Sequence, residues 1–128
     1  MPGSSADRPA SPRLDDDEMI AAARSYVEAL ATHDPSRVPF AADCTRIELG
    51  VRTGRSGPHL RRSLTRGPQY RVIKHVSDFA PRVDDGVVHV TFYVNVLFGL
   101  RAKVTESFEF NAAGEISRIV ASFGMPRR

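Results

Sequence analysis

The chain has 128 residues, of which 41% are hydrophobic and 26% charged, with a formal net charge of +3. This length fits one domain with a single hydrophobic core. The single cysteine excludes an intramolecular disulfide, and the four histidines show no metal-ligand spacing. No apolar run approaches the roughly 20 residues of a membrane span. We therefore expect a soluble domain that binds neither metal nor membrane.

The basic residues are concentrated at the two ends and in one internal run. Residues 52–74 contain seven cationic side chains and no acid. Such a run could hold a phosphate or a carboxylate, but a solvated helix and loop surface explains it more simply. We therefore do not expect nucleic-acid binding.

The N-terminal segment differs in composition from the rest. Residues 1–14 are rich in proline and poor in apolar residues, which predicts a disordered tail. They contain no apolar segment typical of a secretory signal, so a cytoplasmic location is expected. The folded domain is expected over residues 15–125, with a short tail at 126–128.

Three helices are predicted in the first half of the chain. The acids of "DDDE" (15–18) suit the N-terminus of a first helix that ends near His33. Residues at helical spacing give it an apolar stripe: Ile20, Ala23, Val27 and Leu30. "DPSRVP" (34–39) predicts a second helix of one or two turns, and "SGPHLRRSLTRG" (56–67) predicts a third.

A short strand is predicted between the second and third helices, and four longer strands follow the third. The predicted strands cover 44–51, 69–80, 87–99, 101–110 and 115–124. In the longest, an apolar face runs through Val88, Val90, Phe92, Val94, Val96 and Phe98. This order predicts an α+β fold in which a curved antiparallel sheet wraps around the helices.

Glu106 is the most unusual residue of the predicted strands. In a strand it shares a face with Val104, Phe108 and Phe110, which should pack in the core. A carboxylate on that face costs several kcal/mol unless it is paired, protonated or open to a wet cavity. A bulge that moves Glu106 to the other face is the alternative.

Tyr26 and Glu48 also stand out by position. Tyr26 lies at the edge of the first helix's apolar stripe, and the helix alone favours a packed ring with a solvated hydroxyl. Glu48 alternates with Ile47 and Leu49 in the short strand, where a surface ion pair with Arg46 is the simpler interpretation.

Three segments in the same order resemble the ketosteroid isomerase branch of the nuclear transport factor 2-like (NTF2-like) superfamily, which includes SnoaL-like proteins. They are "SYVEALATHD", "FAADCTRIELG…RSG" and "ESFEFNAAGEISRIVASFG", and the resemblance covers roughly residues 19–125. It implies a cone-shaped fold with three N-terminal helices packed on a curved antiparallel sheet. It also implies a homodimer that needs no cofactor.

The resemblance also implies roles for three residues. Tyr26 matches the tyrosine that donates a hydrogen bond to the substrate's carbonyl oxygen. Glu106 falls where the isomerases keep a protonated acid as the second donor, and Glu48 falls on their general base. Both carboxylates are glutamates where the isomerases have aspartates, and Leu49 replaces a proline after the base. The segment between Asp34 and Phe40 is two residues shorter, which should alter the pocket wall.

The expected function is therefore proton transfer next to the carbonyl of a hydrophobic small molecule, such as an enone, steroid or polyketide. An apolar pocket is expected to be lined by Phe79, Val88, Phe92, Phe108 and Phe123. Two alternatives stay open. In an epoxide hydrolase or polyketide cyclase, Glu48 would activate water or a hydroxyl and Glu106 would protonate the epoxide oxygen. The third possibility is a non-catalytic, homodimeric ligand-binding protein.

Overall fold

The computed structural model describes residues 15–128, so the predicted disordered tail (residues 1–14) lies outside the described residues. The elements in chain order are α1 (Asp16–Thr32), β1 (Phe40–Glu48), β2 (Val51–Gly54), α2 (Gly57–Arg66), α3 (Pro68–Arg71), β3 (His75–Asp84), β4 (Val87–Asn95), the 3₁₀ turn η2 (Leu97–Gly99), β5 (Arg101–Phe110) and β6 (Ile116–Phe123).

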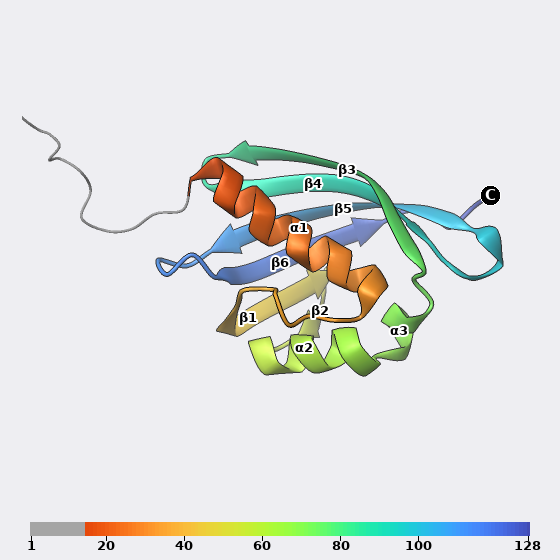
Figure 1. Cartoon of the computed structure of the whole chain (residues 1–128), viewed down its shortest axis with the longest axis horizontal. Coiled ribbons are helices and arrows are strands. Elements are labelled where there is room, and N and C mark those ends of the chain that lie inside the picture. The colour runs from red at the N-terminus through yellow and green to blue at the C-terminus, as the bar shows by residue number, and fades with distance from the viewer. Residues whose placement is uncertain (1–14) are drawn as a thin grey trace, which may run out of the picture.

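The six strands form one curved sheet in the order β2-β1-β6-β5-β4-β3. Figure 1 shows α1 lying across one face of this sheet, with α2 and α3 near the β1–β2 end. The α+β prediction is confirmed, but the sheet is mixed because β1 pairs with β6 in parallel. The expectation of a purely antiparallel sheet was wrong because β1 and β6 are far apart in sequence and no hairpin joins them.

The first helix begins and ends as its sequence predicts. The Asp15 side chain accepts from the Glu18 amide at 2.8 Å, and the Glu18 side chain accepts from the Asp15 amide at 3.1 Å. These two bonds form a capping box. The helix ends where His33 adopts a left-handed conformation with φ 61°.

The second predicted helix (34–39) is only a turn. The Asp34 carboxylate accepts from the Ser36 amide at 3.1 Å, and β1 starts at Phe40. Pro39 ends the turn, so no helical hydrogen bonds can follow. The third predicted helix (56–67) is confirmed as α2, but it follows β1 and β2. The expected arrangement of three N-terminal helices is therefore corrected to one long N-terminal helix and two shorter, later ones.

Four of the five predicted strands have different boundaries in the structure, and β2 was not predicted. The first strand starts four residues earlier than expected, at Phe40. The predicted strand 69–80 begins with α3, because Pro68 occupies the first turn of a short helix, and the strand itself starts at His75. The predicted strand 87–99 ends at Asn95, and Phe98 lies in a turn with φ 67° and 87% of its surface exposed. Phe98 is therefore not part of the apolar face.

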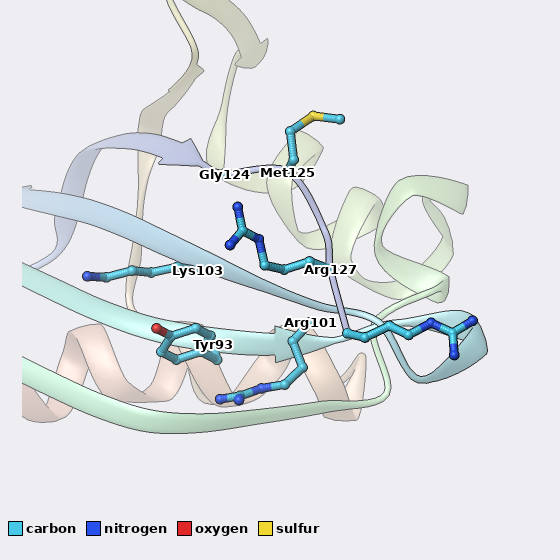
Figure 2. A pocket seen from close by; sticks show the side chains of 7 residues that line it. Tyr93, Arg101, Lys103, Gly124, Met125 and Arg127 are labelled. Carbon is cyan, nitrogen blue, oxygen red and sulfur yellow. The ribbon is translucent and has the colours of Figure 1, made fainter.

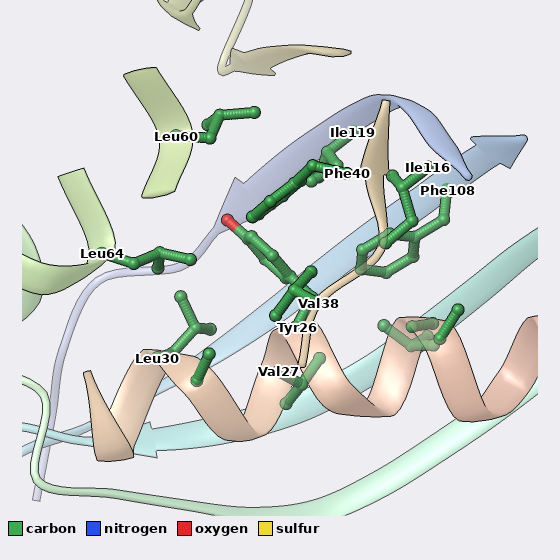
Figure 3. Close-up of a cluster of buried hydrophobic side chains, with 14 of the residues drawn as sticks. Tyr26, Val27, Leu30, Val38, Phe40, Leu60, Leu64, Phe108, Ile116 and Ile119 are labelled. Carbon is green, nitrogen blue, oxygen red and sulfur yellow. The ribbon is translucent and has the colours of Figure 1, made fainter. Parts of the chain in front are cut away.

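The hydrophobic core lies between α1, α2 and the covered face of the sheet (Figure 3). The Tyr26 ring packs edge-on against Phe40 and Phe108, with ring centroids 6.0 and 5.6 Å apart. Alternate residues of β5 are buried, and Glu106 pairs with Val90 of β4 and Ala121 of β6 in regular register. Glu106 therefore faces the core, as its position in the strand predicts.

Two further findings concern the described residues 15–128 as a whole. None of their helices is both long and apolar enough to cross a membrane. They also contain no group of three or more histidine, cysteine, aspartate or glutamate side chains that could hold a metal ion.

Candidate functional site

A single buried arginine brings the three predicted site residues together. Arg46 is 4% exposed, and its Nε donates a hydrogen bond to the Tyr26 hydroxyl at 2.9 Å. Its Nη1 donates to Glu48 Oε1 at 2.5 Å and to Thr53 Oγ1 at 2.9 Å. Its Nη2 lies 3.6 Å from Glu106 Oε2. We call these five side chains the Arg46 cluster.

Four elements supply this cluster. Arg46 and Glu48 are two residues apart in β1, so both side chains lie on the same face of that strand. Tyr26 comes from α1, Thr53 from β2 and Glu106 from β5. The ion pair between Arg46 and Glu48 exists, but the interpretation as a surface pair was wrong. A one-residue shift in the β1–β2 pairing directly after Arg46 accompanies the burial of its side chain.

Glu106 is the least satisfied member of the cluster. It is 1% exposed, and neither carboxyl oxygen has a hydrogen-bond partner among the described residues. Burial raises the pKa of Glu106 to about 7, the Arg46 guanidinium opposes this shift, and the charge of Glu48 adds to it. A carboxyl group with a pKa near neutrality can both donate and accept a proton at physiological pH.

Burial also affects the other members of the cluster. It raises the pKa of Tyr26 well above its usual value, so the phenol stays protonated, although Arg46 works in the opposite direction. Burial alone would lower the pKa of Arg46, but Tyr26, Tyr70 and Glu106 raise it overall. Arg46 therefore carries a permanent positive charge inside the protein.

Tyr70 is a site residue that the sequence analysis missed. It is buried in α3, and the Arg46 guanidinium carbon lies 5.6 Å from the centre of its ring. Burial raises the pKa of Tyr70, while Arg46 lowers it. The signal in the sequence was "GPQY" (67–70), since a proline after glycine starts a helix more readily than a strand.

A cavity of about 230 Å³ opens beside the cluster. Its polar wall consists of Arg46, Glu48, Gln69, Tyr70 and Glu106. The remaining lining is apolar: Leu30, Val72, Ile73, Val94, Val96, Ala102, Val104, Phe123 and Pro126. Tyr26 is not part of the lining, because Arg46 and the core enclose it. The arrangement offers one permanent cation and two carboxyl groups to a mostly apolar ligand.

Only one of the five predicted pocket residues, Phe123, lines this cavity. Val88, Phe92 and Phe108 are fully buried in the core, and Phe79 packs under the Arg24 guanidinium at 4.8 Å. The sequence indicates which face of a strand turns inward, but not where along the strand the helices leave space. That space lies where β4 ends and β5 begins.

A second hollow of about 380 Å³ lies on the opposite face of the sheet. Its lining consists of Tyr93, Arg101, Lys103, Gly124, Met125, Arg127 and Arg128. In Figure 2 the labelled cationic side chains point in different directions and do not converge on one point. The Arg101 guanidinium carbon lies 4.3 Å from the centre of the Tyr93 ring, and Arg101 Nη2 lies 3.4 Å from Asp78 Oδ2. This hollow is therefore a weaker candidate for a specific site.

The basic run 52–74 has a mainly structural explanation. Arg61 donates to the carbonyl oxygens of Pro35 and Val38 at 2.7 and 2.8 Å, which holds α2 against the turn before β1. The six other cationic side chains of the run are exposed. The run is thus the solvated surface that its sequence suggests, with one arginine used for packing.

Comparison with known proteins identifies the fold. Residues 12–123 match the family described as Domain of unknown function (DUF8021), and no curated protein matches the sequence. Among the solved structures with a similar fold, two are described as NTF2-like proteins of unknown function. The chain thus has the NTF2-like fold expected from its sequence.

Three solved structures illustrate the similarity. A candidate ketosteroid isomerase from Kribbella flavida DSM 17836 is 14% identical with a TM-score of 0.69, covering 88% of this chain and 82% of that one. A candidate isomerase of the SnoaL-like family from Agrobacterium tumefaciens str. C58 is 14% identical with a TM-score of 0.67. The match covers 85% of this chain and 99% of that one. The epoxide hydrolase/cyclase-like enzyme SalBIII, which acts in pyran ring formation in the polyether salinomycin, is 14% identical with a TM-score of 0.65, covering 87% and 94%.

Proposed function

The chain belongs to the family described as Domain of unknown function (DUF8021), and we propose that it is an acid/base enzyme for a small hydrophobic carbonyl compound. One observation carries the proposal. Glu48 and Glu106 share one buried arginine at the polar end of an apolar cavity, and Glu106 has a pKa near neutrality. Pairs of carboxyl groups in different environments are a common arrangement for proton transfer at neutral pH.

The proposed reaction is isomerisation of an enone. Glu48 removes a proton from the carbon next to the carbonyl, and the electron pair moves onto the carbonyl oxygen. Arg46 and protonated Glu106 stabilise the resulting enolate, with Tyr70 as a further donor on the cavity wall. Glu48 then returns the proton to a different carbon, so the double bond moves and no cofactor is consumed.

The proposal changes the role expected for Tyr26. Its hydroxyl accepts a hydrogen bond from Arg46 Nε and does not line the cavity. Tyr26 is therefore a positioning residue in this mechanism, because it orients the guanidinium that faces the substrate. Arg46 takes the place in which a tyrosine hydroxyl was expected.

A second candidate function is opening of an epoxide by water or by a hydroxyl of the substrate. Here Glu48 accepts a proton from the nucleophile, whose oxygen forms a new bond to an epoxide carbon. The epoxide C–O bond breaks, and Glu106 donates its proton to the released oxygen. The neutral-range pKa of Glu106 favours this function too, because a general acid must be protonated at working pH. SalBIII, an epoxide hydrolase/cyclase-like enzyme, has a similar fold.

The test uses a small β,γ-unsaturated ketone, cyclohex-3-en-1-one, in D₂O. We expect the protein to convert this ketone to the conjugated enone, and NMR measures the rate. Glu48→Gln should lower that rate about 100-fold or more. The matched control is Glu109→Gln, which removes an exposed acid from the other face of β5 and should keep wild-type activity. Wild-type turnover in Glu48→Gln would contradict the mechanism.

Labelled water separates the candidate functions. Incorporation of ¹⁸O from solvent into the diol formed from cyclohexene oxide would favour epoxide hydrolysis. Binding of these compounds without turnover of either would favour a non-catalytic ligand-binding protein. The expected homodimer and cytoplasmic location stay predictions.

A further inference from the structure

We propose that the natural ligand is the size of one substituted ring and carries a single polar group, which Arg46 and Glu106 hold at the closed end of the cavity. Ala102 and Phe123 set the size limit. This inference rests on the proposed function in one respect, since it takes the Arg46 cluster as the place where the reacting oxygen lies. It departs from the steroid-sized substrate that the sequence suggested.

The volume of the cavity sets the scale. Sites for drug-sized ligands measure roughly 300–1,000 Å³, whereas this cavity measures about 230 Å³. An apolar cavity of roughly 150 Å³ in another protein holds one benzene molecule. The cavity described here therefore accommodates one six-membered ring and a few more atoms. The four fused rings of a steroid would leave most of their surface in water.

The walls of the cavity explain why it is short. Ala102 and Val104 of β5 are buried and lead to Glu106 at the closed end. At the mouth, the lining consists of Phe123, which is 44% exposed, and Pro126, three residues later in the C-terminal segment. A larger side chain at Ala102 would occupy space that the ligand needs.

The mouth is held by backbone hydrogen bonds. The Gly124 amide donates to the Lys103 carbonyl at 3.0 Å, and the Arg101 and Arg127 backbones exchange two hydrogen bonds of 2.8 Å. These bonds attach the C-terminal segment to the start of β5. The rim near Phe123 is therefore part of the sheet structure.

The polar end indicates the chemistry of the ligand. Both oxygens of Glu106 are buried without a hydrogen-bond partner among the described residues, although Arg46 Nη2 lies 3.6 Å from Oε2, and such a group is costly to leave unsatisfied. The neighbouring Arg46 can only donate. A ligand oxygen can accept from Arg46 and from protonated Glu106, and the hydroxyl of an enol or phenol can also donate to Glu106 when that carboxyl is ionised. Beyond the polar wall, the nine remaining lining residues are apolar, so their side chains offer no hydrogen-bond partner to a second polar group.

A series of 4-alkylphenols tests the size limit. We expect the dissociation constant, measured by NMR titration of the ¹⁵N-labelled protein, to fall about fourfold for each buried methylene. The gain in affinity should stop after the first few alkyl carbons, which gives a plateau in the dissociation constant. Estradiol, a steroidal phenol, should bind no more tightly than the alkylphenols at this plateau. The proposal is overturned if estradiol binds more than tenfold tighter than every alkylphenol, or if no phenol binds.

Two variants test the residues that set the limit. Ala102→Leu should weaken the binding of the longer alkylphenols about tenfold, so that the affinity reaches its plateau at a shorter alkyl chain. Phe123→Ala should move the plateau to a longer alkyl chain. Met125→Ala is the matched control, because Met125 lies two residues after Phe123, is 82% exposed, and lines the second hollow but not the cavity beside the Arg46 cluster. A plateau that neither variant moves overturns the proposal. A confirmed plateau together with full activity of Glu48→Gln would reject the reaction and keep the ligand size.

Discussion

Arg46 decides the chemistry of the site through its charge. Buried charges are costly unless they are paired, and Arg46 contacts two carboxyl groups. With Glu106 protonated, the charges of Arg46 and Glu48 cancel; with Glu106 ionised, the cluster has a net charge of −1. Burial and the charge of Glu48 thus disfavour ionised Glu106, even beside a guanidinium. The cluster stores one proton that it can release near neutrality.

Removing this cation should destabilise the protein strongly. Arg46→Met leaves Glu48 and Glu106 without their shared partner, and loss of one member of a buried ion pair costs about 3–5 kcal/mol. We expect a loss of that size in urea unfolding at neutral pH, and a smaller loss under acidic conditions where the carboxylates are protonated. Arg52→Met, which removes an exposed arginine of β2, should change stability by less than about 0.5 kcal/mol. Equal effects of the two substitutions would contradict this account of Arg46.

At the level of secondary structure, the pairing of β1 with β2 positions Arg46. Gly54 lies opposite Arg46 in the register of these strands. A Cβ atom at position 54 would collide with the Leu60 side chain of α2 and lie 2.9 Å from the Arg46 Cβ. Glycine therefore allows α2 to pack directly on the strand that supplies Thr53 to the cluster.

Gly54→Ala should consequently disturb both packing and site. Overpacking of this kind costs about 1–3 kcal/mol, and we expect that loss in chemical unfolding together with ¹⁵N shifts of residues near Arg46. Gly124→Ala is the control, because a Cβ there would have no atom within 4 Å. If Gly54→Ala were as stable as Gly124→Ala, the close approach of α2 to β2 would not exist.

Local sequence patterns predicted some of these elements and residues but not others. The strand 101–110 was predicted with its exact bounds, and the face of Glu106 followed from its alternation. The burial of Arg46 was not predictable, because its partners Tyr26 and Glu106 are distant in sequence. Tyr70 was missed because a four-residue helix has almost no periodic pattern. Strand pattern alone could not locate the cavity, which depends on where the helices end.

For the whole molecule, the site and the stability of the fold are in conflict. Burial raises the pKa of the Glu106 carboxyl from 4.5, the ordinary value for an exposed glutamate, to about 7 in the folded protein. Between these values the folded state binds more protons than the unfolded state, so stability falls as pH rises. Below this window Glu106 is neutral in both states and costs nothing through ionisation.

Glu106→Gln should therefore remove a pH-dependent loss of stability. Relative to this variant, the wild type should lose on the order of 3 kcal/mol of unfolding free energy as pH rises from about 4.5 to about 7. Chemical unfolding of both proteins across this range measures the difference. Glu109→Gln should show no such pH-dependent difference. A wild type that gains stability relative to Glu106→Gln with rising pH would reverse the sign and reject the argument.

The most direct test of the site is the pKa of Glu106 itself. The side-chain carboxyl carbon can be followed by ¹³C NMR in protein labelled at glutamate, with the signal assigned by its absence in Glu106→Gln. The account predicts a titration midpoint near pH 7. A midpoint below about 5, close to that of an ordinary glutamate, would mean that Glu106 is ionised at neutral pH, and it would contradict its role as the proton donor of the cavity.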